Sequence, residues 1–306
     1  MTTSALRAPL LIAALALLWG SGFFWIKLAL DGLSPFQLTF ARLALGALVL
    51  GAIVAIRRLP VPRTRLIWAH LTVAALIANA IPYTLFAVAE QSVASSLAGT
   101  VNATTPLWTA VIASVVGVDR LASMRRVVGL VVGFGGALVL LSPWDIDVHG
   151  SVLGALACVG AAISYGVSYV YQARYITNRG VPPLMLAFAQ TCAATALLAL
   201  TLPVAGRQVP HLTATVLIAI TVLGVLGTGV AYVINYALIT TEGPTAASVV
   251  TYLVPAVSVA LGATFLREPT GPNLLGGAVL ILLGVALVQR RRAPAASVRK
   301  AASPRQ

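Results

Sequence analysis

Polar side chains inside long apolar stretches are the residues of this sequence whose types could do chemistry. Arg42 is the only charged residue well inside such a stretch, seven residues after Pro35. A guanidinium group at that depth could bind the carboxylate of a small molecule. It could also be structural, as an ion pair with Glu90 or Asp31 or by reaching the membrane surface. The residue 148 positions later is Gln190, which is neutral, and this difference favours a specific role for the charge.

Amide, hydroxyl and aromatic side chains accompany three prolines in the same stretches. Pro82 has no N–H, so it should free a backbone carbonyl and kink its helix, and Pro106 and Pro255 should kink two matched segments. The candidate binding residues are Trp19, Arg42, Asn79, Tyr83, Asn102, Thr105, Trp108, Tyr165, Tyr169, Gln190, Tyr232, Asn235 and Tyr252. Small-residue helix packing is the alternative role of the hydroxyls. An apolar space with a few such groups suits a neutral or zwitterionic organic molecule.

Catalytic and metal-binding patterns are missing from the sequence. No HExxH, CxxC, GxSxG or P-loop pattern occurs, and the longest connectors between apolar stretches have about ten residues. The sequence therefore predicts no enzyme, no cofactor and no metal site.

The acids Asp31, Glu90, Glu242 and Glu268 lie at the ends of apolar stretches. Glu90 is the best candidate for proton coupling among them, and facilitated diffusion is the alternative.

The elements that must position these residues are membrane-spanning helices. Hydrophobic residues make up 59% of the chain and charged residues only 9%, whereas soluble proteins have about 25% charged residues. We predict an all-α membrane protein of ten transmembrane helices, because the apolar runs are continuous and long enough to cross a bilayer. The predicted ranges are 9–30, 35–56, 66–89, 92–117, 124–142, 151–173, 182–202, 213–237, 244–266 and 271–289.

The sequence contains an internal duplication of about 148 residues. Trp19-Gly20 and Tyr165-Gly166 are 146 positions apart, Pro106 and Pro255 are 149 apart, and Gly129 and Gly277 are 148 apart. Each copy holds five predicted helices, and an odd number turns the second copy upside down in the membrane. We therefore predict two inverted five-helix repeats, residues 9–142 and 151–289, around a central cavity.

The net charge of +13 reflects topology. With the N-terminus in the cytoplasm, sixteen Lys and Arg residues lie on the cytoplasmic side and three on the other. The positive-inside rule then predicts a plasma (inner) membrane protein with both termini cytoplasmic and a basic cytoplasmic tail at 290–306. The arginines are spread over short connectors, which argues against nucleic-acid binding. The expected partners are a small-molecule substrate and the lipid bilayer, for a monomer or homodimer.

The doubled pattern resembles the drug/metabolite transporter superfamily, and in particular its proteins of two EamA domains. The segments "LLWGSGFFWIKLAL" and "SPFQLTFARLALGALVL" are similar to the opening helices of a first domain, with Arg42 where the family commonly has arginine. The segments "NATTPLWTAVIASVVGVDRLASMRRVVGLVVGFGGALVLL" and "VVTYLVPAVSVALGATFLREPTGPNLLGGAVLILLGVALV" are similar to the two domain ends, and Glu268 matches a family glutamate. The likeness covers residues 9–290.

The resemblance implies alternating access and export of amino acids, other metabolites or toxic compounds. With the uncharged aromatic candidates above, we expect a multi-pass exporter of small organic metabolites, above all neutral or aromatic amino acids. Efflux of lipophilic drugs or toxic compounds is an alternative within transport. A non-transporting receptor or scaffold is an alternative of another class.

Overall fold

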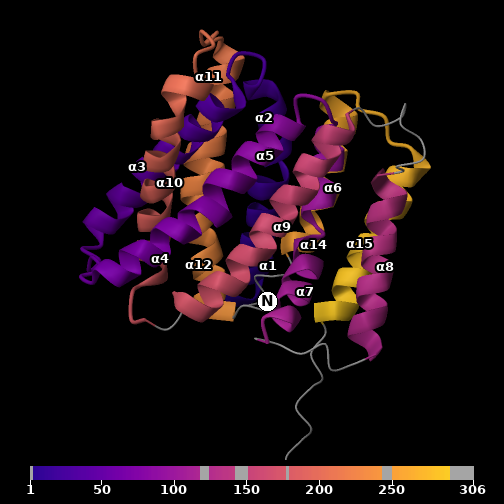
Figure 1. The fold of residues 1–306 in the computed structure, drawn as a ribbon, viewed down its shortest axis with the longest axis horizontal. Coiled ribbons are helices and arrows are strands. Elements are labelled where there is room, and N and C mark those ends of the chain that lie inside the picture. Colours follow the sequence, from indigo (N-terminus) through magenta and orange to yellow (C-terminus); the bar gives the residue numbers. More distant parts are fainter. Residues whose placement is uncertain (1–2, 118–123, 142–150, 177–178, 243–249, 290–306) are drawn as a thin grey trace, which may run out of the picture.

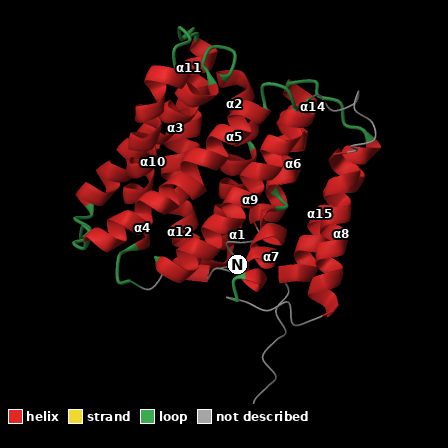
Figure 2. Cartoon of the chain, in the orientation of Figure 1, coloured by secondary structure: helices red, strands yellow, loops and turns green. Residues whose placement is uncertain are grey.

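The computed structural model describes residues 3–117, 124–141, 151–176, 179–242 and 250–289. Within these ranges the chain forms helices and connecting loops without any strand (Figures 1 and 2), which confirms the all-α class there. The helices are α1 (Thr3–Gly20), α2 (Gly22–Ala29), α3 (Pro35–Ile56), α4 (Arg65–Ala75), η1 (Leu76–Ala80), α5 (Ile81–Ala89), α6 (Ser95–Asn102), α7 (Thr105–Val115), α8 (Met124–Leu141), α9 (Val152–Tyr175), α10 (Pro183–Ala205), α11 (Ala214–Thr221), η2 (Val222–Val230), α12 (Ala231–Glu242), α14 (Val250–Phe265) and α15 (Pro272–Gln289).

Seven helical stretches in these ranges are long and apolar enough to cross a membrane. They are Ala8–Ala29, Pro35–Ile56, Arg65–Ala89, Met124–Leu141, Val152–Tyr175, Pro183–Ala205 and Ala214–Asn235. The chain is therefore a multi-pass membrane protein. Shorter apolar helices follow at Leu253–Phe265 and Pro272–Val288, and the stretch predicted at 92–117 is divided into α6 and α7. The number of ten transmembrane helices stays a prediction.

The π-helical segment η1 interrupts one long stretch just before Pro82. The N–H of Ile81 donates to the carbonyl of Leu76, five residues back, and Pro82 has no N–H to continue the series. The carbonyl of Ile77 instead accepts a hydrogen bond of 2.7 Å from the Ser164 hydroxyl of α9. A side chain from a neighbouring helix thus supplies the partner that a backbone oxygen needs inside a membrane.

A second π-helical segment, η2, occupies the matching place in the second half. Residues 76–80 shifted by 148 positions fall at 224–228, inside Val222–Val230. Here glycines let α3 approach closely. A Cβ on Gly224 would lie 2.5 Å from Leu45 of α3, and a Cβ on Gly229 would lie 2.7 Å from Val49. π-Helical insertions are frequent at functional sites, so these two segments direct attention to the residues that they carry.

The matched prolines Pro106 and Pro255 occupy different positions in their helices. Pro106 is in the first turn of α7, where a missing N–H is tolerated. Pro255 is buried within α14, which stays helical through it. The kinks expected at Pro82, Pro106 and Pro255 stay predictions.

Helices α8 and α15 lie side by side at one edge of the molecule (Figure 1) and meet through glycines. A Cβ on Gly129 would lie 2.8 Å from the carbonyl oxygen of Gly284, and one on Gly136 would lie 2.9 Å from that of Gly277. Low numbers on α8 meet high numbers on α15, so the two helices are antiparallel. Close backbone contact between small residues is a main way of joining helices in lipid.

We expect Gly136→Ala to lower the thermal stability of the purified protein and Gly135→Ala to leave it unchanged. A methyl group at position 136 would lie 2.6 Å from Leu280 Cβ, whereas one at 135 meets no atom within 4 Å. Overpacking of this kind costs about 1–3 kcal/mol. Melting temperatures in detergent check the comparison, and equal values for the two variants would contradict the close contact.

Candidate functional site

Arg42 is positioned by a well-defined start of α3. The Ser34 hydroxyl accepts from the backbone N–H of Gln37, the Gln37 side chain accepts from the N–H of Ser34, and Pro35 occupies the first turn. This capping box fixes the entry of the helix. Arg42 follows about two turns later, on the buried side, with 9% of its surface exposed.

The guanidinium group of Arg42 binds a residue from the second half of the chain. Its Nε–H donates to the Thr228 hydroxyl of η2 at 3.1 Å, and its Cζ lies 4.1 Å from the centre of the Tyr83 ring. The Thr228 hydroxyl donates to the carbonyl of Leu223 at 3.0 Å, which leaves its oxygen to accept. A hydrogen bond and a cation–π contact therefore stabilise the charge.

Three of the predicted residues form a second polar group in the interior. The Gln190 amide on α10 donates to Asn79 Oδ1 at 2.5 Å. The Asn79 amide donates in turn to the Tyr232 hydroxyl of α12 at 3.1 Å. Asn79 is fully buried and Gln190 is 8% exposed. Buried amides need such partners, so these bonds hold η1, α10 and α12 together.

The two groups are counterparts under the sequence duplication. We call Arg42, Thr228 and Tyr83 the Arg42 triad, and Gln190, Asn79 and Tyr232 the Gln190 triad. Arg42 and Gln190 are 148 positions apart, while Tyr83 and Tyr232, like Asn79 and Thr228, are 149 apart.

In each triad, a long helix of one half binds the π-helical segment of the other half. The interface between the halves is therefore joined by two equivalent polar bonds, only one of which carries a charge.

Thr228 was not among the predicted residues. Its threonine side chain is common in helix packing, and its hydroxyl gave no distinctive signal. The signal that could have found Thr228 is its offset of 149 from Asn79. Because Arg42 and Gln190 are counterparts in the duplication, a polar partner for one of them implies a polar partner at the equivalent position for the other.

An aromatic series continues from the Arg42 triad into the core. The rings of Tyr83 and Tyr165 lie 6.4 Å apart, Tyr165 and Phe86 lie 6.3 Å apart, and Phe86 and Phe23 lie 5.3 Å apart. Tyr169 follows Tyr165 by one helical turn and is 54% exposed. The structure thus places the guanidinium group at one end of a series of aromatic rings that continues into the buried core.

The other candidates lie outside the triads. Trp108 packs edge-on against Phe134, with ring centres 4.7 Å apart. Trp19 and Asn235 are partly buried on α1 and α12, and Asn102 is partly buried at the end of α6. Thr105 is buried, and its hydroxyl has no partner among the described residues. The Tyr252 side chain lies outside the described residues.

No ion pair joins Arg42 to Glu90 or Asp31 within the described part of the chain, where its polar contacts are Thr228 and Tyr83. In the same part, no three His, Cys, Asp or Glu side chains gather as metal ligands would.

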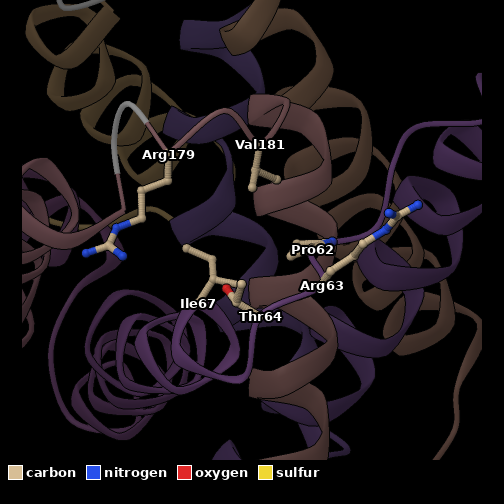
Figure 3. A pocket seen from close by; sticks show the side chains of 6 residues that line it. All are labelled: Pro62, Arg63, Thr64, Ile67, Arg179 and Val181. Carbon is tan, nitrogen blue, oxygen red and sulfur yellow. The ribbon is translucent and has the colours of Figure 1, made fainter.

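A surface cavity of about 390 Å³ lies apart from the triads, beside the α3–α4 and α9–α10 connections. The side chains lining it are Pro62, Arg63, Thr64, Ile67, Arg179 and Val181 (Figure 3). The guanidinium groups of Arg63 and Arg179 point away from each other (Figure 3), so they do not form a joint anion site. The cavity includes no predicted binding residue.

Comparison with known proteins gives a family and a fold. The model of the EamA-like transporter family matches residues 6–142 and 152–290. The Bacillus subtilis (strain 168) protein named "Uncharacterized transporter YvbV" is 26% identical over 286 residues, covering 93% of this chain and 92% of that protein. The Escherichia coli (strain K12) protein named "Uncharacterized inner membrane transporter YedA" is 26% identical, covering 81% and 79%. A solved crystal structure, 22% identical, covers 92% of this chain and 97% of its own with a TM-score of 0.65, which shows a shared fold.

We expect Thr228→Val to destabilise the folded protein by about 1–3 kcal/mol, because it leaves the buried Arg42 Nε–H without its acceptor. Thr221→Val is a matched control, since Thr221 is exposed on α11 and its hydroxyl bonds to its own helix at Leu217. Thermal melting of both variants checks the difference. An equal loss in the two would mean that the bond across the halves contributes nothing.

Proposed function

Since this chain belongs to the EamA-like transporter family and is a membrane transporter, we propose that it exports small organic metabolites by alternating access. Neutral or aromatic amino acids are the proposed substrates. The observation that carries this choice is the Arg42 triad beside the aromatic series, because a guanidinium group and the neighbouring tyrosine rings match the two ends of such a molecule.

The proposed architecture is ten transmembrane helices in two inverted repeats of five, residues 9–142 and 151–289. Three features support it: the offset of about 148 residues in the sequence, the antiparallel packing of α8 on α15, and the equivalent bonds of the two triads. The relative named an inner membrane transporter supports the same location for this chain. The charge distribution supports cytoplasmic termini.

The substrate carboxylate would bind the Nη groups of Arg42. The Nε–H at the other edge of the guanidinium plane donates to Thr228, so the plane is held while its outer edge can make two parallel bonds to a carboxylate. Tyr83, stacked on Arg42, would contact the substrate next to its carboxylate. Tyr165, which is partly buried and packs on the core residue Phe86, would then contact an apolar or aromatic side group.

Transport would require the two halves to move against each other at the triads. Both triads join one half to the other through buried hydrogen bonds. When the halves rearrange, Arg42 would lose its hydrogen bond to Thr228. A substrate carboxylate bound to Arg42 would give the guanidinium group a new partner, and this would lower the free-energy cost of separating the halves at the Arg42 triad. The neutral Gln190 triad would then act as the pivot.

We expect Arg42→Ala to lower the apparent affinity for amino acids by about 10- to 100-fold, the value of a charge-assisted hydrogen bond. Arg207→Ala is the control, since Arg207 is exposed and its Nε donates to the nearby Pro203 carbonyl. The measurement is counterflow of labelled neutral and aromatic amino acids in proteoliposomes. Saturable exchange in the wild type and its loss in the first variant alone are the expected results.

A second comparison separates substrate contact from structural support. The wild type should prefer an amino acid to its carboxamide, and Arg42→Ala should lose that preference even where some flux remains. An unchanged preference in a folded variant would exclude the carboxylate contact. If the wild type exchanges planar organic cations but no amino acid, the drug-efflux alternative replaces this proposal, and absence of any flux favours a receptor or scaffold.

A further inference from the structure

Glu90 is a buried carboxyl group at the end of α5. It follows the last residue of that helix and has no exposed surface. Neither carboxyl oxygen accepts a hydrogen bond from any residue that the structure describes. Buried acids are normally paired or hydrogen-bonded, so the position of this group needs an explanation.

The charged and titratable neighbours of Glu90 come from four other parts of the fold. They are Lys27 on α2, Arg42 on α3, Cys158 on α9 and Glu268 after α14. The ammonium group of Lys27 donates to the backbone carbonyls of Glu90 and Val93, at 2.6 and 3.1 Å. It therefore stabilises the end of α5 without forming an ion pair with the Glu90 carboxyl. Arg42 is likewise bound to Thr228.

Glu268 gives an internal comparison, because it lies in the same region and has the opposite environment. Its two carboxyl oxygens accept from the backbone N–H groups of Ser95 and Ser96, at 2.7 and 3.0 Å. These groups form the N-terminus of α6, a position that favours a negative charge. Glu268 is thus placed as a carboxylate, whereas Glu90 has no donor to stabilise that form and a second negative charge nearby.

We propose that Glu90 is a proton-binding site whose occupancy follows the packing of α2, α5 and α6. Helix α2 contacts α6, its Phe23 ring packs 5.3 Å from Phe86 of α5, and its Lys27 binds the carbonyls of Glu90 and Val93 in the connection between α5 and α6 (Figure 1). In the packed arrangement the carboxyl holds its proton, because the neutral form tolerates burial. When the helices separate, water reaches Glu90, accepts the proton and solvates the carboxylate. The packed arrangement therefore carries one more proton than the separated one.

This site would couple the proposed transport to pH, and in that respect it rests on the proposed function. In the predicted topology, Lys27 and Glu90 lie at the ends of their helices away from the cytoplasm. A low pH on the outer side would keep Glu90 protonated and so keep that side closed. A single titrating group changes a rate by at most about tenfold per pH unit, which bounds the effect.

The first test is infrared spectroscopy of the purified protein without substrate. The wild type should show the carbonyl band of a protonated carboxylic acid at neutral pH. Glu90→Gln should remove the band, Glu90→Asp should shift it, and Glu268→Gln should leave it in place. Absence of the band in the wild type, or a band unchanged in both Glu90 variants, would overturn the proposal.

The second test is counterflow with varied pH on the outer side. Wild-type exchange should slow as that pH falls, and exchange by folded Glu90→Gln should not respond. An equal response in both would overturn the coupling. If the wild type shows no exchange with any amino acid, the proposed substrates are wrong, yet the infrared result still decides the proton site.

Discussion

A guanidinium group in an apolar interior must keep its hydrogen-bond partner, and the partner of Arg42 belongs to the other half of the chain. The surrounding structure meets this requirement in several ways. The Thr228 hydroxyl is oriented by its bond to Leu223, and the glycines of η2 let α3 come close enough for the bond to form. Tyr83 covers the face of the guanidinium plane. The two halves are consequently coupled at Arg42, the residue that we propose to bind the substrate carboxylate.

The sequence singles out most residues of the two triads, because a polar group inside a membrane is energetically costly and therefore stands out. Arg42, Gln190 and Asn79 stand out within apolar helices, and the structure brings each into a triad. Trp108 and Trp19 stand out equally in the sequence, yet they pack outside the triads, Trp108 against Phe134 and Trp19 against the hydrophobic core. Aromatic rings are also common in hydrophobic cores. Residue type alone cannot separate these two uses.

Other features depend on contacts that no local pattern contains. Glu268 binds the start of α6, about 170 residues earlier in the chain, and the sequence places it only at a helix end. The contrast between Glu268 and Glu90 arises from which backbone N–H groups each one meets in three dimensions. Pro82 signals an irregular helix in the first half, whereas the matching π-helix in the second half contains glycines, whose effect depends on the packing of α3.

The contacts between α8 and α15 are reciprocal: Gly129 meets Gly284, and its counterpart Gly277 meets Gly136. Such reciprocity is the property of an interface between two identical subunits, here contained in one polypeptide. Two identical subunits have the same residue at both positions related by their two-fold axis, so an arginine at one triad would require a second arginine at the other. Two like charges would then share one apolar interior. In one polypeptide the two halves can differ in sequence, so one triad contains an arginine and the equivalent position of the other contains a neutral glutamine amide.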